Sequence, residues 1–197
     1  MPDELSDLDI VLRSRTNPDA FGLLFARYWP AIFTYCLRRL QEPDAADDAA
    51  SSVFVKAFAA RERFQSFRSP SGHNVRSWLF SIAHNVVVDA WRSNRQTLSV
   101  DRPGSTIAAT LADRGTPPED EALDAEEARV VAAVLTHLPE RQRSLVELRL
   151  SGLSTTEVAE ILGLSVSATK SLQFRAYRAL RDVLRANPAL LTREIPS

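Results

Sequence analysis

The sequence feature that most constrains the fold is segment 154–181, STTEVAEILGLSVSATKSLQFRAYRALR, which predicts two helices joined by a tight turn. Ser154 stands three residues before Glu157, the spacing of a capping box, in which the serine hydroxyl and the glutamate satisfy each other's exposed backbone donors. Gly163 is expected to end the first helix in the left-handed conformation. Ser165 is expected to cap the second helix. The pattern is typical of a helix-turn-helix.

The second helix of this segment has two unlike faces. The first helix is expected to bury Val158, Ile161 and Leu162. The packing stripe of the second helix is expected to be Val166, Thr169, Leu172, Ala176 and Leu180. A helix presented in this way fits the major groove of DNA, where Lys and Arg reach phosphates or guanine edges and apolar side chains contact thymine methyls. The pattern favours DNA binding over a merely solvated basic face. The side chains expected to face outward are Ser167, Lys170, Ser171, Phe174, Arg175 and Arg178.

The rest of the chain also shows helical periodicity and no strand alternation, which predicts an all-α fold. One helix is expected over 19–40, bent or split at Pro30. A second is expected to be capped by Asp44, to carry Asp47 and Asp48 in its first turn, and to run to Phe64. The Ser-, Pro- and Gly-rich segment that follows predicts a loop.

A long helix is expected from Val75 to about Arg95. Its two faces are predicted to differ, so that one packs and the other is free to bind. Trp78 is expected in the core, whereas Trp91 is assigned to neither face. The packing stripe is Val75, Trp78, Leu79, Ile82, Val86 and Ala90, and the free face is Ser77, Ser81, Asn85, Asp89 and Arg92.

Residues 97–118 have the composition of a linker, with three prolines and two glycines and little apolar periodicity. The sequence therefore predicts two small helical domains, 1–96 and 119–197, joined by a flexible linker. The formal net charge of −1 hides an uneven distribution. Segment 61–96 has six Arg against two acids, a balance of +4, and segment 101–127 has two Arg against eight acids, a balance of −6. A basic segment thus precedes an acidic connector.

Several classes of protein are disfavoured by the composition. No apolar run approaches the ~20 residues of a membrane helix, and the N-terminus is acidic, unlike a signal peptide, so a cytoplasmic protein is expected. The single cysteine, Cys36, is expected in the core. His73, His84 and His137 lack metal-binding spacing, and no phosphate-binding glycine loop or Gly-x-Ser-x-Gly motif occurs. We expect no enzyme activity, no cofactor and no metal site.

Four stretches narrow the function further: FGLLFARYWPAIFTYCLRRL, DAADDAASSVFVKAF, VRSWLFSIAHNVVVDAWR and LPERQRSLVELRLSGLSTTEVAEILGLSVSATKSLQFRAYRALR. In order and spacing, residues 21–96 and 138–185 resemble regions two and four of the sigma-70 family, in its extracytoplasmic-function (ECF) class. The resemblance implies a subunit that binds core RNA polymerase, through the coiled coil of the largest subunit and through the flap, and directs it to promoter DNA. It also implies control by an anti-sigma factor.

The resemblance also implies roles for individual residues. Asp47 and Asp48 match the positions that dock on the polymerase coiled coil, although Ser51 and Ser52 stand where the family usually has Gln and Glu. The minus-ten element would be bound by Lys56, Phe64, Asn85, Arg92 and Arg95. The minus thirty-five element would be bound by Lys170, Ser171, Phe174 and Arg175 with their outward neighbours Ser167 and Arg178, and by Arg149 at a phosphate.

Two other functions compete with this interpretation. A stand-alone helix-turn-helix regulator would need no polymerase-docking face, and a pure interaction protein would need no outward basic stripe. A further hypothesis is that the acidic connector folds back on the basic faces and suppresses DNA binding in the free protein, because its −6 balance complements them.

Overall fold

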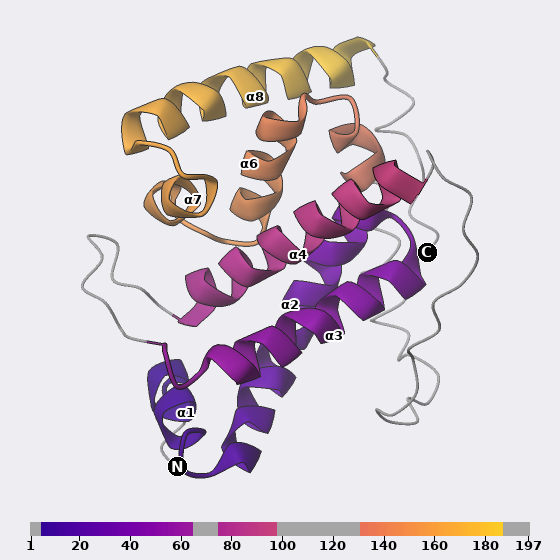
Figure 1. The fold of residues 1–197 in the computed structure, drawn as a ribbon. Helices are drawn as coiled ribbons and strands as arrows, with labels where there is room; N and C mark the ends of the chain where they lie inside the picture. The colour runs from indigo at the N-terminus through magenta and orange to yellow at the C-terminus, as the bar shows by residue number, and fades with distance from the viewer. Residues whose placement is uncertain (1–4, 65–74, 98–130, 187–197) are drawn as a thin grey trace, which may run out of the picture.

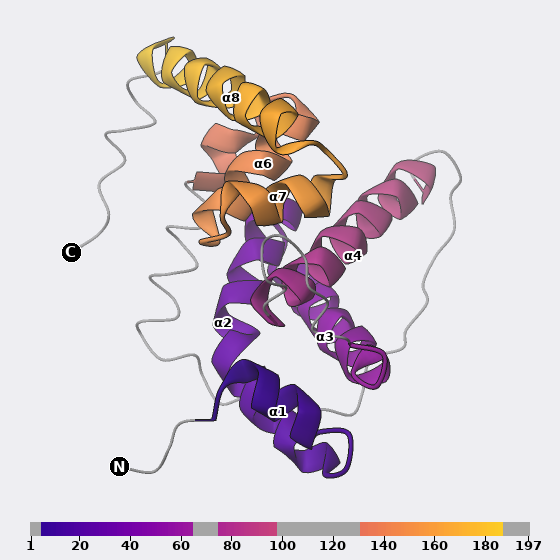
Figure 2. The same ribbon diagram turned by 90° about the vertical axis from the view of Figure 1, so that its left-hand side faces the viewer.

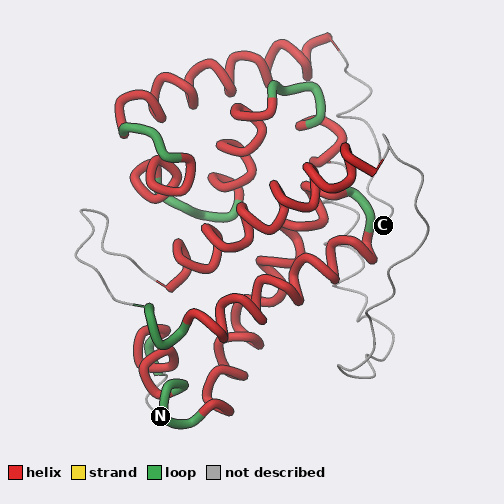
Figure 3. The backbone as a smooth tube through the Cα atoms, viewed as in Figure 1, coloured by secondary structure: helices red, strands yellow, loops and turns green. Residues whose placement is uncertain are grey.

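The computed structural model describes residues 5–64, 75–97 and 131–186, with the backbone alone for 93–97. Within these ranges the regular elements are all helices, and no strand occurs (Figure 3). The prediction of an all-α fold is confirmed. The predicted linker at 97–118 lies outside the described residues except for Thr97, which is helical.

The helices form two groups that pack on each other. In Figures 1 and 2, α8 lies at one end of the molecule, α6 and α7 lie beneath it, α2, α3 and α4 follow, and α1 lies at the opposite end. Residues 131–135 add one helical turn before α6. The N-terminal group is α1 (Asp7–Arg13), a short 3-10 helix (Pro18–Ala20), α2 (Phe21–Leu40), α3 (Pro43–Ala60) and α4 (Val75–Thr97), and the C-terminal group is α6 (Glu140–Leu150), α7 (Thr155–Leu162) and α8 (Val166–Ala186).

Helix α2 is the central element of the N-terminal group. It continues through Pro30, so the predicted split does not occur there. Its inner face buries Leu24, Ile32 and Cys36 completely. The sequence patterns did not reveal α1, yet α1 contributes two fully buried side chains, Ile10 and Val11, to the same core.

Helix α3 differs from the expectation at both ends. It begins at Pro43 after Glu42, so Asp44 lies in the first turn instead of capping the helix, and Asp47 and Asp48, predicted in the first turn, lie one turn later. A proline suits this first position because its missing N–H would have no partner there in any case. The helix ends at Ala60, four residues earlier than predicted.

Helix α4 is buried over a wider face than its predicted stripe. Phe80, Ala83 and Val87 are fully buried although the predicted stripe did not include them, and Ser77, predicted on the free face, is only 5% exposed. The cause is that α4 lies between two sets of helices, with α2 and α3 on one side and the C-terminal group on the other (Figure 1). Within the predicted stripe, three residues are buried and three are half-buried, namely Val75, Leu79 and Val86 against Trp78, Ile82 and Ala90. Trp78 packs against the core, as predicted.

The helix-turn-helix has the local structure that the sequence predicts. The backbone N–H of Glu157 donates to Oγ of Ser154 at 3.2 Å, and the backbone N–H of Ser154 donates to Oε2 of Glu157 at 2.7 Å. Gly163 ends α7 with φ of 64°, in the left-handed region. Oγ of Ser165 accepts from the backbone N–H of Ala168 at 3.1 Å and caps α8. These contacts satisfy backbone donors at the starts of α7 and α8 and end α7 at Gly163.

The turn glycine provides a stability prediction. We expect Gly163→Ala to lower the free energy of unfolding by about 1–2 kcal/mol, because a Cβ is disfavoured in the left-handed region. No heavy atom lies within 4 Å of the added Cβ, so the cost comes from the backbone alone. The matched control is Gly22→Ala in α2, where a Cβ also meets nothing and φ is ordinary, and there we expect no loss. Thermal unfolding followed by circular dichroism measures both, and equal behaviour of the two variants would contradict the prediction.

Candidate nucleic-acid interface

The outer face of α8 carries the predicted recognition residues. Ser167, Lys170, Ser171, Phe174, Arg175 and Arg178 are all exposed, as the sequence indicated. Phe174 is 70% exposed, which is unusual for an aromatic side chain of this size. The opposite face packs inward through Thr169, Leu172 and Ala176. The structure thus separates a packing face from a free face on one helix.

Two residues of α8 change this surface. Val166 was expected in the packing stripe, but this first residue of α8 is 39% exposed. Tyr177, which the sequence pattern did not single out, is 44% exposed and stands three residues after Phe174. Side chains three residues apart neighbour each other on a helix, so Tyr177 extends the same face. The three-residue spacing from Phe174 could have identified Tyr177 from the sequence.

The charge of α8 suits a polyanionic partner. The helix contains five basic residues against one acid, Asp182, a balance of +4. Such a local excess of Lys and Arg allows phosphates to be neutralised even in a chain whose net charge is −1. The basic residues are Lys170, Arg175, Arg178, Arg181 and Arg185, all of them exposed.

Arg149 lies away from this face and is engaged within the protein. Its Nη1 donates to the carbonyl oxygen of Leu153, and its Nε is buried. This contact ties the end of α6 to the segment before α7. This one hydrogen bond leaves other donors of the guanidinium, so the phosphate contact of Arg149 stays a prediction.

The residues predicted to bind the minus-ten element are divided among different environments. Asn85 and Arg92 are exposed on α4, and Lys56 is exposed on α3. Phe64 is only 5% exposed, and its ring packs on Trp78 with centroids 4.7 Å apart. Arg95 lies on the helical backbone of α4, and its side chain is outside the described residues. The structure brings Asn85 and Arg92 together but places Phe64 in the core.

Asn85 and Arg92 line a groove between α4 and the C-terminal helices, which we call the α4 groove. Its volume is about 610 Å³. One wall is α4, and the other combines the polar first turns of α6 with an apolar edge from α7 and the turn after it. The lining residues are His84, Asn85, Val88, Asp89, Arg92, Glu140, Arg141, Ser144, Ile161, Leu162 and Leu164.

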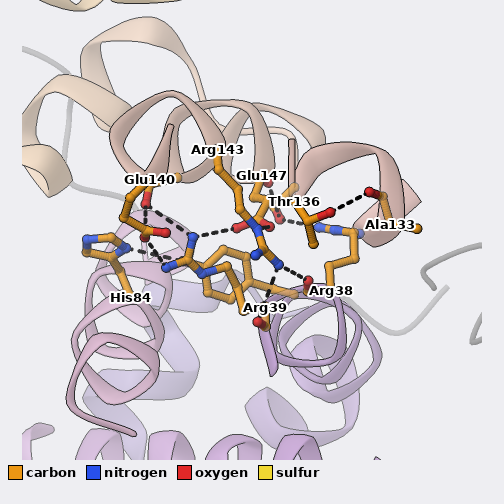
Figure 4. Close-up of polar contacts among 11 residues, drawn as sticks. Arg38, Arg39, His84, Ala133, Thr136, Glu140, Arg143 and Glu147 are labelled. Atoms are coloured by element: carbon orange, nitrogen blue, oxygen red, sulfur yellow. Dashed lines mark hydrogen bonds and ion pairs between the residues drawn. The ribbon is translucent and has the colours of Figure 1, made fainter. Parts of the chain in front are cut away.

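Beside the α4 groove, charged side chains join α2 to α6 (Figure 4). We call Arg38, Arg39, Glu140, Arg143 and Glu147 the interdomain ion cluster. Nη2 of Arg39 lies 2.5 Å from Oε1 of Glu140, and its Nη1 lies 3.1 Å from Oε2 of Glu147. The side chains of Arg39 and Glu147 are 1% and 0% exposed. Charges buried this deeply require such partners.

Further contacts of the cluster cross the same boundary. Nε of Arg143 donates to Oε1 of Glu147 at 2.8 Å, and its Nη2 donates to the carbonyl oxygen of Arg38 at 2.6 Å. Nη2 of Arg38 donates to Oγ of Ser151 at 3.0 Å. Arg76 of α4 donates to the carbonyl oxygen of Ser151. The C-terminal helices are thus held to both α2 and α4.

Burial shifts the pKa of several groups next to the cluster. Desolvation and the nearby Arg39 charge lower the pKa of His84, which favours its neutral form. Nδ1 of His84 lies 3.3 Å from the hydroxyl oxygen of Tyr35. Partial burial opposes ionisation of Glu140, but the hydrogen bonds from Arg39 and Ser144, together with the charges of Arg39 and Arg143, outweigh burial and lower its pKa. Burial raises the pKa of the Cys36 thiol to about 12, so this predicted core cysteine remains an unreactive thiol.

Helix α3 presents a separate acidic face. Asp44, Asp47 and Asp48 are exposed, and Ser52 continues this face. Val55, seven residues after Asp48, is 62% exposed and was not singled out by the sequence pattern. The seven-residue spacing places both on one side of the helix, and this spacing is the signal that identifies Val55.

The described residues contain neither a metal-ligand cluster nor a membrane-spanning helix. No set of three or more His, Cys, Asp or Glu side chains there is grouped as metal ligands would be. Among the described helices, none combines the length and apolar character that crossing a membrane requires.

Comparison with known families agrees with this geometry. Residues 24–97 match the model of sigma-70 region 2, and residues 128–180 match the model of sigma-70 region 4. The ECF RNA polymerase sigma-E factor of Haemophilus influenzae is 30% identical, over 92% of this chain and 97% of that protein. The ECF RNA polymerase sigma factor BldN of Streptomyces coelicolor is 32% identical, over 90% of this chain but only 65% of BldN.

Solved structures show the same fold. CnrH, solved in complex with the cytosolic domain of CnrY, is 26% identical and superposes with a TM-score of 0.66, over 92% of this chain and 98% of that chain. The sigma factor RpoE from Bartonella quintana, solved with the anti-sigma factor NepR, is 24% identical with a TM-score of 0.61, over 84% and 96% of the two chains, and supports the fold alone. The two family models and the relative from Haemophilus influenzae, which this chain matches over nearly its full length, place the chain in the sigma-70 family, among the ECF RNA polymerase sigma factors.

Proposed function

We propose that α8 of this sigma factor reads the minus thirty-five element of its promoters in the major groove. The observation that carries this proposal is the free face of α8, where Lys170, Phe174 and Arg175 are exposed on a helix held by a complete helix-turn-helix. Lys170 and Arg175 can reach phosphates or guanine edges, and Phe174 can contact thymine methyls. Ser167, Ser171 and Arg178 border this face, and the exposed Tyr177 extends it.

We propose that α4 binds the melted minus-ten strand. Asn85 supplies an amide for the edge of an exposed base, and Arg92 supplies charge for the backbone. Lys56 of α3 and Arg95 of α4 are further basic residues for the same strand. Because Phe64 is packed on Trp78, we assign it support of this surface instead of direct stacking on a base.

We propose that the exposed face of α3 docks on core RNA polymerase. Asp47 and Asp48 supply charge, and Val55 supplies an apolar contact of the kind that strengthens an interface core. Ser51 and Ser52 offer only short hydroxyls where the family usually has longer polar side chains. The flap of polymerase is the corresponding partner for the C-terminal group.

The partners and location follow from the same assignment. CnrH and the RpoE of Bartonella quintana were solved with CnrY and with the anti-sigma factor NepR, respectively. We propose that an anti-sigma factor also binds this chain, that the chain acts in the cytoplasm, and that it performs no catalysis of its own.

Transcription with purified core polymerase tests these assignments. Specific initiation from a duplex promoter that requires both core polymerase and this protein is the expected result, and a premelted template separates minus-ten melting from the other steps. Association with duplex DNA without any binding to core polymerase would instead indicate a stand-alone helix-turn-helix regulator. Absence of both DNA binding and initiation would indicate a pure interaction protein.

Charge reversal on α3 should weaken polymerase binding. We expect Asp48→Arg to lower the affinity for core polymerase roughly 10- to 100-fold, because a favourable charge contact becomes a repulsive one. The affinity can be measured by fluorescence anisotropy of the labelled protein. Asp19→Arg is the matched control, since Asp19 is exposed in the short 3-10 helix before α2 and lies outside α3. An equal loss in both variants would show that the effect is general electrostatics instead of docking.

A further inference from the structure

The minus-ten surface proposed for α4 faces the C-terminal helices. Asn85, Asp89 and Arg92 form one wall of the α4 groove, and Glu140, Arg141 and the apolar edge of α7 form the other. A volume of about 610 Å³ is that of a pocket for a single small molecule. A strand bound to Asn85 and Arg92 would have to share this groove with the C-terminal helices, so the wall restricts its access to α4.

The contacts that hold the wall in place are polar and deeply buried. Arg39 makes ion pairs with Glu140 at 2.5 Å and with Glu147 at 3.1 Å, and Figure 4 shows its guanidinium between these two carboxylates. Arg76 reaches from α4 to the carbonyl oxygen of Ser151. Arg38, on α2, also reaches Ser151. Each of these contacts joins the region 2 match to the region 4 match.

An interface of this kind is suited to opening. When the two groups separate, water can solvate the exposed charges, and the desolvation penalty of the closed state then offsets much of the attraction between the paired charges. An apolar interface of equal area lacks this compensation. Loss of one partner has the opposite consequence, because a buried charge without its counterion strongly disfavours the closed state.

We propose that the interdomain ion cluster, with Arg76, is an autoinhibitory latch, which holds the C-terminal helices over the minus-ten surface of α4 and must open before that surface binds a melted strand. The proposal rests on the assignment of α4 to the minus-ten element. It differs from inhibition by the acidic connector, since every contact that it uses lies between described helices. Polymerase would favour the open state by holding the two regions apart.

A cysteine reporter can measure opening directly. Ser144 is 3% exposed and lies 3.3 Å, Oγ to Nη1, from Arg39, so a Ser144→Cys side chain is accessible to a bulky maleimide only in the open state. The native Cys36 is fully buried with a raised pKa, so it should not compete. When closing is faster than labelling, the labelling rate follows the open fraction.

The variants are compared in the full-length reporter protein. We expect Arg39→Ala and Arg76→Ala each to accelerate labelling at least tenfold and to increase the radius of gyration measured by small-angle X-ray scattering. Arg76 is only half-buried, so its variant tests the proposal even if Arg39→Ala fails to fold. Arg27→Ala is the matched control: it removes the Arg27–Asp7 ion pair within the N-terminal group, and we expect a rate within twofold of the parent.

Binding of a fluorescent single-stranded DNA pool of mixed sequence completes the test. We expect the opening variants to bind it at least fivefold more tightly than the parent protein. Unchanged labelling in folded Arg76→Ala and Arg39→Ala proteins would overturn the latch. Faster labelling without tighter DNA binding would overturn autoinhibition, even if the same proteins still initiate transcription with core polymerase. If neither the parent protein nor the opening variants supported promoter-specific transcription with core polymerase, the proposed function would be overturned instead.

Discussion

Replacing Lys170 and Arg175 together with alanine is expected to weaken promoter binding by the polymerase complex at least 30-fold. A side chain that touches a base edge is expected to contribute about 1–3 kcal/mol to the binding free energy. If a side chain neutralises a phosphate instead, its removal should make the affinity depend less on salt concentration. The two residues lie on the free face of α8, and neither is in its packing stripe. Binding of the complex to duplex promoter DNA, measured over a series of salt concentrations, gives both quantities.

The control for this prediction is Arg181→Ala with Arg185→Ala, which removes equal charge from the C-terminal part of the same helix. We expect this pair to have the smaller effect, since these residues follow the proposed recognition residues. Association with core polymerase should be unchanged in both double variants. If both pairs weakened binding equally, α8 would attract DNA through its overall charge, and the assignment of Lys170 and Arg175 to the minus thirty-five element would be wrong.

The second large effect is expected on stability. Glu147→Ala removes the carboxylate that faces both Arg39 and Arg143, whose side chains are 1% and 6% exposed. Breaking a buried ion pair by removing one partner costs about 3–5 kcal/mol, because the remaining charge is left without compensation. For a chain of this size that corresponds to a fall in melting temperature of roughly 6–20 °C. Differential scanning calorimetry would measure it.

Glu62→Ala is the matched control for this effect. The Glu62 side chain is 70% exposed and lies 3.9 Å from Arg61, and an exposed pair of this kind contributes about 0–1 kcal/mol. If Glu147→Ala lowered the melting temperature as little as Glu62→Ala does, water would be replacing the missing carboxylate. The buried arginines would then not depend on Glu147.

The helix-turn-helix was the part of the fold that the sequence predicted best. The capping box at Ser154 and Glu157, the turn at Gly163 and the cap at Ser165 all depend on residues a few positions apart, so a local pattern contains the whole interaction. The outward positions of α8 followed from the same periodicity. Family membership was likewise predictable, because the order and spacing of the motifs can be read directly from the sequence.

Long-range packing was not predictable in the same way. Two adjacent arginines at the end of α2 look like solvent-exposed residues in the sequence, yet Arg38 and Arg39 are 9% and 2% exposed. Their partners lie in α6 and at its end, 101 to 113 residues further along the chain. The burial of Phe64 and Ser77 has the same origin. No periodicity within one helix reports which distant element will cover it.

The paired charges between α2 and α6 also limit how freely regions can be exchanged between sigma factors. A hybrid that joins this region 2 to the region 4 of a relative would place Arg39 opposite whatever side chains occupy the positions of Glu140 and Glu147. Without carboxylates there, Arg39 would favour separated domains. Promoter specificity transplanted in this way would therefore come with an altered resting conformation, and hybrid regulators designed from this chain should carry the α2 and α6 residues as one unit.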